Sequence, residues 1–552
     1  MIKNEAKLKT NLSIRPEKCN FMYFMDNIVP LSGQITRKVG ELGINVQYDG
    51  CIVLGVPIGR TNAWIESEAL RLIQSQNKLF SGILHLHTPV QNAMLLLKTC
   101  GVPRLSYLLR TVRPSAMKKA VQSFGDTLMD TALKKLKIFK ESGISDIYWN
   151  NALEQITLPV RHGGFGLTNF KTISHVAYYS SVAAAVESNG VLKLTNNSHT
   201  LTPRGARLTD TLLKELDKCL HTIRKELDVK PHSLLNNFLP DALGDNGANF
   251  LSKFTPHGSA VALLHAANLQ HKLTAWLQKI QNEKFTQAVT SLGDGDKARF
   301  SAISAPHSND WIKAMPIMNM TTLHDDAYCQ AARLRLGLKP HDLMPVDCLI
   351  CHASTATDPW HYLTCKGYRK TILGARHDSI VKAVQEVVQI AGGAVVCEPP
   401  RTSTDDLRRP DHLIALDNKL IYTDVSVTHP TAVSYVAQKL SLGQLQLADK
   451  KAQEKIDKYK DIIPTSAEFN PFVVETYGGI GRHAQHLINQ ISVYASEHQS
   501  VWDENEVGNF LTFAIAMNIQ RGNARAVNHG YLYNVRSIQA PIRKPRRTHF
   551  HL

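Results

Sequence analysis

The chain lacks an apolar run of transmembrane length, and its opening residues, MIKNEAKLKTNL, contain no apolar segment of the kind that a secretory signal needs. We therefore expect neither a membrane partner nor secretion. The chain also lacks an even set of cysteines: six of its nine cysteines are scattered, and three cluster between residues 348 and 365. That pattern does not suit a disulfide framework and favours a reducing compartment.

Acidic residues are outnumbered, because 47 Asp and Glu face 63 Lys and Arg, for a net charge of +16. Such a surplus favours a polyanionic partner, most commonly nucleic acid. The alternative is a basic but soluble enzyme. A basic tail at residues 543–547 is either a disordered end or a nuclear address or DNA-backbone contact. Its charged residues are Arg543, Lys544, Arg546 and Arg547.

A length of 552 residues and a hydrophobic content of 43% leave room for several cores. Residues 1–60 are rich in strand patterns, and residues 61–345 are mostly helical in pattern. After residue 347 the pattern predicts an α/β domain with a mixed sheet, in the order α-β-β-β-α-β. Its expected elements are a helix at 379–391, strands at 394–397, 412–416 and 420–427, a charged helix that ends before Pro464, and a strand at 472–475.

A Cys/His cluster precedes this domain, with the spacing Cys348-x2-Cys351-x9-His361-x3-Cys365. Asp358 followed by proline is typical of a helix start, and such a helix would place His361 and Cys365 on one face. Three sulfurs and one imidazole complete a closed tetrahedral zinc site, which indicates a structural rather than a catalytic metal. Scattered core cysteines are the alternative.

The stretch RRPDHLIALDNKLIYTDVSV, residues 408–427, consists of two apolar runs joined by Asp417-Asn418, a pair suited to a two-residue hairpin turn. Counting outward from that turn, Asp411 faces Asp424. Opposed like charges destabilise a sheet, and more so in apolar surroundings. Mg²⁺ would resolve the conflict, since it binds one or two carboxylates and keeps its other positions for water and phosphate oxygens. The alternative is that one aspartate contacts solvent at a turn or sheet edge.

The stretch ADKKAQEKIDKYKDII predicts a helix on which Lys455 falls inside an apolar stripe, whereas Lys451 and Lys458 lie to one side. An inward lysine beside the aspartates would stabilise the charge that develops on a phosphate. The alternative is a lysine whose stem covers apolar surface while its head reaches water. The stripe consists of Ala448, Ala452, Tyr459 and Ile463.

These motifs together resemble the carboxy-terminal part of non-long-terminal-repeat retrotransposon polyproteins that carry a restriction-like endonuclease of the PD-(D/E)xK group. The resemblance covers nearly the whole chain and is strongest after residue 347, over residues 348–479. It rests on the Cys-Cys-His-Cys knuckle, the Arg376-His377 pair opening a helix, the Arg-Pro-Asp of 409–411, an aspartate 13 positions later, a Lys-x3-Tyr helix, and a strand ending in Glu-Thr-Tyr-Gly-Gly. Earlier in the chain, RPEKCNF, VLGVPIG and LPVRHGGFGL are similar to the palm end and helical thumb of the same polyproteins' reverse transcriptase.

The resemblance implies that Asp411 and Asp424 bind catalytic Mg²⁺ and that Lys455 and Tyr459 complete the catalytic site. We expect Arg376, His377, Arg408, Arg409 and the basic tail to contact nucleic acid. The implied fold is a multidomain α+β protein with a mostly helical thumb and linker, a small zinc knuckle, and a restriction-endonuclease-like α/β domain. The expected segments are a palm remnant (1–60), a thumb-like region (61–235), a linker (236–345), the knuckle (346–378), the endonuclease (379–490) and a C-terminal extension (491–552).

Two features depart from the family pattern. Ser426 stands two positions after Asp424, where many nucleases of this group have their lysine, so the helix face makes Lys455 the choice. The Phe/Tyr-x-Asp-Asp turn of the polymerase is also missing, and FMDN at 24–27 follows the RPEKC stretch instead of preceding it. We therefore expect a polyprotein fragment or truncated copy that does not synthesise DNA.

The functional expectation is a Mg²⁺-dependent DNA endonuclease, in the nucleus, that nicks target DNA and can also contact the element's RNA. Lys and Arg contacts to phosphates would supply affinity without sequence choice. A rival function is a non-catalytic nucleic-acid-binding remnant of a mobile element. A second rival is an interaction scaffold whose charge only keeps the chain soluble.

Overall fold

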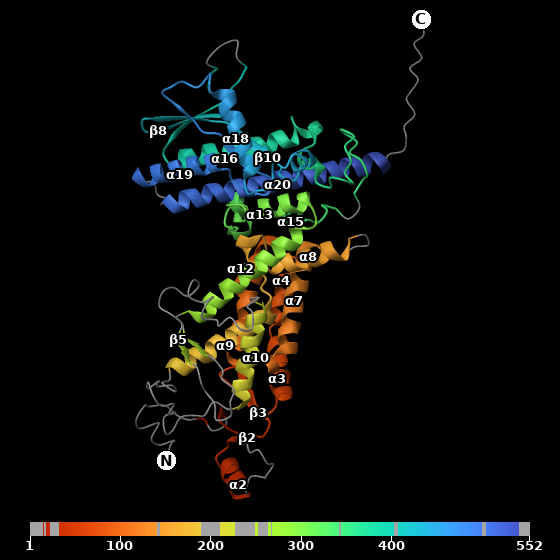
Figure 1. Ribbon diagram of the computed structural model, residues 1–552, viewed down its shortest axis with the longest axis vertical. Coiled ribbons are helices and arrows are strands. Elements are labelled where there is room, and N and C mark those ends of the chain that lie inside the picture. Colours follow the sequence, from red (N-terminus) through yellow and green to blue (C-terminus); the bar gives the residue numbers. More distant parts are fainter. Residues whose placement is uncertain are drawn as a thin grey trace. The chain divides into compact units, whose positions relative to one another are not determined.

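The computed structural model describes Arg15 and residues 18–22, 33–140, 144–188, 210–226, 249–251, 263–265, 268–341, 344–401, 407–498 and 504–539. The chain forms two compact units (Figure 1). Unit 1 consists of residues 1–82, 101–129 and 169–280, and unit 2 of residues 83–100, 130–168 and 281–552.

Unit 1 combines short strands with helices, as the pattern predicted. Strands β3 (Gly50–Val53) and β4 (Val56–Gly59) form an antiparallel hairpin beneath Trp64. A Cβ atom at Gly50 or Gly59 would lie 2.4 or 2.3 Å from the Trp64 ring, so the hairpin needs glycine at both places. The other elements are β1 (Asn20–Met22), α2 (Gly33–Glu41), β2 (Asn45–Gln47), α3 (Asn62–Gln74), α4 (Asn77–Leu84), α6 (Ser106–Thr111), α9 (Phe170–Ser188), α10 (Asp210–Glu226), β5 (Asn249–Leu251) and β6 (Leu263–His265).

Unit 2 begins with a helical part. Its α15 (Asp325–Leu336) is buried along most of its length and ends at Gly337, whose φ of 72° is left-handed. The guanidinium of Arg335 donates to the carbonyls of Val160 and Gly164, which fixes the glycine turn of LPVRHGGFGL. The other helices are α5 (Val90–Leu96), α8 (Asp146–Thr157), α13 (Asp294–Ile303) and α14 (Asp310–Lys313), while α7 (Lys118–Leu136) and α12 (Leu269–Thr290) contribute residues to both units.

The rest of unit 2 is an α/β part with two ladders. The first has the order β11-β9-β8-β7, with β8 antiparallel to both neighbours and β11 parallel to β9; the second pairs β10 with β12 in parallel. The mixed α/β character that the sequence predicted is therefore confirmed. The strands are β7 (Ala394–Cys397), β8 (His412–Leu416), β9 (Lys419–Thr423), β10 (Val425–Thr428), β11 (Glu468–Phe469) and β12 (Phe472–Glu475). The helices are α16 (Ile372–Ile390), α17 (Val433–Ala437), α18 (Gln446–Tyr459), α19 (Arg482–Glu497) and α20 (Glu504–Gln539).

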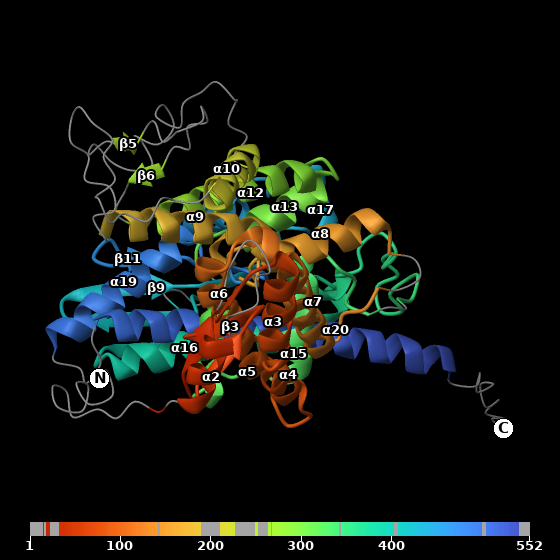
Figure 2. The same cartoon turned by 90° about the horizontal axis from the view of Figure 1, so that it is seen from below.

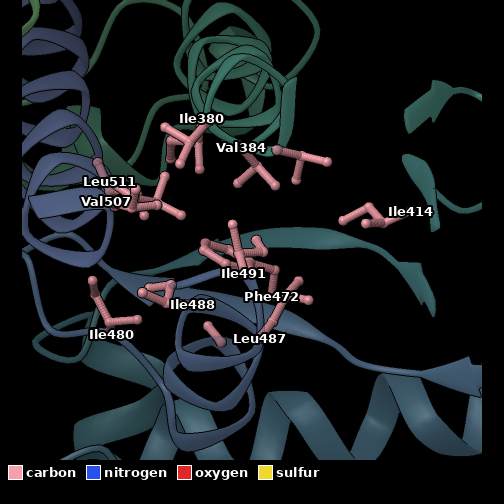
Figure 3. Packing of buried hydrophobic residues seen from close by; sticks show 14 of the residues in the cluster. Ile380, Val384, Ile414, Phe472, Ile480, Leu487, Ile488, Ile491, Val507 and Leu511 are labelled. Atoms are coloured by element: carbon pink, nitrogen blue, oxygen red, sulfur yellow. The ribbon is translucent and has the colours of Figure 1, made fainter. Parts of the chain in front are cut away.

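One apolar core holds this α/β part together. Alternate residues of β8 are buried, and Ile414 and Leu416 belong to the same core as Ile380 and Val384 of α16. Figure 3 shows Ile414, Ile380 and Val384 in this core. Helices α16 and α20 lie side by side in both views (Figures 1 and 2), and Leu511 of α20 belongs to the same core. Helices α19 and α20 supply buried residues to this core as far as Ile519, so the segment expected as a C-terminal extension contributes part of the core.

Two boundaries differ from the sequence expectation. The helix expected from residue 379 begins at Ile372. The single strand expected at 420–427 is interrupted at Asp424, and its two halves join different ladders. The reason lies in hydrogen bonding, because the Val425 amide donates to the Asp411 carboxylate and the Asp424 carbonyl accepts from Phe472. Neither the Val425 amide nor the Asp424 carbonyl is then available to continue the pairing with β8.

Candidate functional site

The Cys/His cluster converges as its spacing predicted. The ligand atoms of its members lie within 4.8 Å of one another. Cys351 Sγ is 3.0 Å from His361 Nε2 and 3.6 Å from Cys365 Sγ, which in turn is 3.9 Å from Cys348 Sγ. Burial lowers the pKa of His361, so the imidazole stays neutral, as a ligand must be. Three sulfurs and one nitrogen at this separation fit a structural zinc ion.

The local backbone of the cluster differs from the expected helix. Two short 3₁₀ turns, His361–Leu363 and Lys366–Tyr368, replace a continuous helix across the ligands. Cys365 between them has φ −56° and ψ 122°, which is not helical. A Cβ atom at Gly367 would lie 2.0 Å from Ile350, so the second turn packs closely on the segment that carries the first two cysteines. The ligands therefore meet through tight turns.

Helix α20 anchors the cluster from one side. The Leu349 amide donates to Asn534 Oδ1 at 3.0 Å, and the Tyr368 hydroxyl lies 3.0 Å from His529 Nδ1. A Cβ atom at Gly530 would lie 2.4 Å from the Tyr362 ring, which shows how closely the helix passes. The knuckle is thus docked on the same helix that packs into the α/β core.

The hairpin of β8 and β9 has the register predicted from Asp417-Asn418. Leu416 pairs with Lys419 and His412 pairs with Thr423, so Asp411 and Asp424 follow at the open end. Asp417 takes the left-handed region with φ 50°, which aspartate tolerates better than most residues. The turn therefore sets which residues flank the open end.

Asp411 is held by a backbone amide and a histidine. Its Oδ2 accepts from the Val425 amide at 2.6 Å and lies 3.3 Å from His377 Nε2. Burial by itself raises the Asp411 pKa, but the hydrogen bond and charge of His377 and the Val425 amide outweigh it, so the pKa lies below its usual range. The carboxyl group is therefore ionised at neutral pH. Its side chain is 20% exposed, which keeps it within reach of a ligand.

Asp424 is more buried and is held by helix α18. Lys455 Nζ makes an ion pair and hydrogen bond with its Oδ2, and the Tyr459 hydroxyl donates to its Oδ1 at 2.7 Å. The same hydroxyl donates to the Arg409 carbonyl at 3.1 Å, so Tyr459 also contacts the segment that leads to Asp411. The Asp424 side chain is 9% exposed. Lys455 thus points inward, as its place in the apolar stripe predicted.

Electrostatics distinguish the lysines of α18. Burial and the neighbouring charge of Lys458 lower the pKa of Lys455 to about 8, while Asp411 opposes this shift. Lys458 is not remote from the site, because its Nζ lies 2.9 Å from the Tyr459 hydroxyl. Lys451 points elsewhere: its Nζ pairs with Glu454 at 2.6 Å and lies 5.4 Å from the Tyr435 ring centroid.

The arginines expected to contact nucleic acid differ in exposure. Arg376 is 5% exposed, donates to Asn523 and to the Leu363 carbonyl, and packs where Gly522 lacks a Cβ. Direct phosphate contact by Arg376 does not fit this burial, which corrects that expectation. Arg409 is partly exposed and pairs with Glu398, and Arg408 donates to the Lys458 carbonyl. The residues of the basic tail, Arg543, Lys544, Arg546 and Arg547, lie outside the described residues.

Sequence reasoning missed the partners of Asp411. His377 was expected to touch nucleic acid, whereas it lies against Asp411. Its position four residues before Val381, which packs against the core, could have indicated that it turns inward. The Val425 amide and the Arg409 carbonyl offered no such signal, because side-chain patterns do not reveal backbone donors and acceptors.

A scan against protein-family models and a search of curated proteins return no match for this chain. Of the helices in the described residues, none has the combined length and apolarity that a bilayer crossing requires.

Proposed function

We propose that the chain is a metal-dependent DNA endonuclease whose catalytic site is formed by Asp411, Asp424, Lys455 and Tyr459. The observation that supports this best is the Lys455–Asp424 ion pair at the open end of the hairpin, with Tyr459 on the second oxygen. An ionised carboxylate, a buried carboxylate and an inward lysine on neighbouring elements form the composition needed for phosphodiester hydrolysis. The motif order of non-long-terminal-repeat retrotransposon endonucleases supports the same function.

The carboxylates fit a hard divalent cation. Both are oxygen ligands, Asp411 is ionised, and Mg²⁺ needs only one or two carboxylates besides water and phosphate oxygens. In this structure Lys455 brings a positive charge to Asp424, and His377, whose pKa rises despite burial because of the neighbouring Asp411, lies beside Asp411. When bound, Mg²⁺ would polarise the scissile phosphate and activate a water molecule.

The protein's own groups have separate roles in this proposal. Lys455 stabilises the negative charge that develops on the phosphate, since its ammonium is largely removed from solvent. Tyr459 orients the Asp424 carboxylate through its hydroxyl. His377 and the Val425 amide fix the Asp411 carboxylate, which keeps one oxygen engaged and directs the other.

The zinc knuckle supports this function from outside the catalytic site. We propose that it holds zinc permanently and that its surface, together with lysines and arginines elsewhere, binds DNA or the element's RNA through phosphates. The net charge of +16 supports a polyanionic partner. The second candidate function, a non-catalytic nucleic-acid-binding remnant, shares this binding and differs only in lacking cleavage.

A plasmid-nicking assay separates the two functions. Supercoiled DNA is incubated with the full chain in Mg²⁺, and we expect open-circular product that disappears with a chelator. Asp411→Asn and Asp424→Asn each remove a charged ligand without changing shape, and each is expected to reduce nicking below detection while DNA binding persists. Asp457→Asn is the matched control, because Asp457 is exposed on the same helix as Lys455 and contacts Gln453. Nicking by both site variants at the wild-type rate would leave only the binding function.

A further inference from the structure

Unit 2 has an open pocket of about 670 Å³ that none of the residues described above lines. Its walls come from α15, from the segment after α7, and from the last turns of α20. This volume lies within the range of small-ligand sites. Aromatic rings, cations and amides all line this pocket.

Aromatic rings present flat surfaces at this pocket. The rings of His341 and Tyr531 stack with centroids 3.9 Å apart and planes 16° apart. Phe139 also lines the pocket and is 56% exposed, so its ring is open to a ligand. Nucleic-acid bases stack on such rings with little sequence preference.

Cations accompany the rings. Lys137, whose side chain is 64% exposed, lies two residues before Phe139. Arg333 donates to the carbonyls of Lys137 and Lys339, at 2.9 and 3.1 Å, so it ties these two segments of the wall together. Asp326 is the pocket's carboxylate, 3.7 Å from Lys137 Nζ and highly exposed. The two cations outweigh it, which favours a ligand carrying phosphate.

A buried amide adds a polar group. Gln330 lines the pocket, is 8% exposed, and donates from Nε2 to the Pro340 carbonyl and to Asn528 Oδ1, at 3.1 and 3.2 Å. Its Oε1 has no hydrogen-bond partner among the described residues. That oxygen is itself closed to solvent, so Gln330 belongs to the wall of the pocket and not to its open face.

We propose that this pocket binds single-stranded nucleic acid, with a base stacked on the Phe139 and Tyr531 rings and the adjoining phosphate near Lys137. Rings and cations together match how proteins hold single strands, whereas a duplex buries its base faces and cannot use the rings. The site does not depend on the endonuclease, since it shares no residue with the Asp411 and Asp424 site. It would keep an unpaired strand on the protein whether or not that strand is cleaved.

Fluorescence anisotropy with labelled 12-nucleotide oligoadenylate, as DNA and as RNA, tests the proposal on the full chain. Phe139→Ala and Tyr531→Ala are each expected to weaken binding on the order of 10-fold. Lys137→Ala is expected to lower the slope of log affinity against log salt by about 0.7, which lost folding would not produce. Tyr533→Ala is the matched control, because Tyr533 is 48% exposed on the same helix but does not line the pocket.

Photocrosslinking gives a second measurement that no folding defect can imitate. A 12-nucleotide strand containing 5-iododeoxyuridine should crosslink to wild-type protein at Phe139 or Tyr531, as mapped by mass spectrometry. Crosslinks confined to other segments, or equal affinity of the wild type and the three pocket variants for both oligonucleotides, would overturn the proposal. Plasmid nicking by Phe139→Ala at the wild-type rate is expected in either case, so this test is separate from that of the endonuclease.

Discussion

The Cys/His cluster and the carboxylate site of unit 2 gather polar side chains in opposite ways. The cluster takes its ligands from one short segment, residues 348–365, folded by tight turns. The carboxylate site takes its members from α16, a hairpin and α18, across residues 377–459. Each aspartate has a side-chain nitrogen beside it, from His377 or Lys455, whereas the four ligand atoms of the cluster face one another. The carboxylates are thus stabilised by the chain itself, whereas the cluster fits a metal ion as the common partner of its ligand atoms.

The largest expected effect follows from this contrast. Removing zinc by a strong chelator, or replacing Cys365 by Ser, should unfold the knuckle, because zinc binding supplies about 10–16 kcal/mol in comparable small domains. Burial raises the pKa of the Cys365 thiol to about 12, which opposes a thiolate unless a metal binds it. Metal analysis and limited proteolysis of residues 344–371 measure the outcome. Cys100→Ser is the control, since Cys100 is exposed and outside the cluster; equal zinc in both variants would refute the assignment.

Removing Lys455 should have the next largest effect, which we expect on the rate of DNA nicking. Lys455→Ala is expected to lower nicking about 10²–10³-fold, because it removes a stabilising charge beside Asp424. Alanine is the better helix former, so α18 should persist. Lys451→Ala is the control, since Lys451 pairs with Glu454 away from the site. If Lys458→Ala loses activity and Lys455→Ala retains it, then the lysine that contacts the Tyr459 hydroxyl is the catalytic one.

A smaller effect is expected from Tyr459→Phe. The change deletes the hydroxyl that donates to Asp424 Oδ1 but keeps the ring, which is 1% exposed and packs against Phe469. One hydrogen bond to a charged group contributes about 1.5–3 kcal/mol, so nicking should fall at least about 10-fold with little change in fold. Nicking rates measure the loss of activity, and circular dichroism checks that the fold is kept. Unchanged activity would mean that Tyr459 only fills space.

The smallest effect should come from the turn that sets the hairpin register. Asp417→Val places a β-branched residue at φ 50° and should lower the free energy of unfolding by about 1–2 kcal/mol. Asp417→Gly, which suits that φ, is the control and removes the same 2.9 Å contact with His498. Urea unfolding compares the two variants. Equal stability would show that the turn does not hold the register.

Local patterns predicted the cluster and most strands because both depend on near neighbours in the chain. The residues of β7, β8 and β12 were predicted in full, since their apolar runs end at turn residues. The break at Asp424 could not be predicted, because it arises when a side chain, Asp411, captures the Val425 amide. The burial of Arg376 likewise depends on Gly522, far away in the sequence. The inward turn of Lys455 was predictable because helical spacing fixes which face a residue occupies.

Helix α20 has a consequence for the order in which the chain can mature during synthesis. It packs against α16, α19 and the knuckle, and it is the last helix among the described residues to leave the ribosome. Until residues 504–539 have been made, α16 and the knuckle lack the apolar and hydrogen-bond contacts that α20 provides. Uncovered apolar surface makes a nascent chain prone to aggregation and a client for chaperones. The α/β part therefore completes its core only once residues 504–539 have left the ribosome, however early the hairpin and the knuckle take shape.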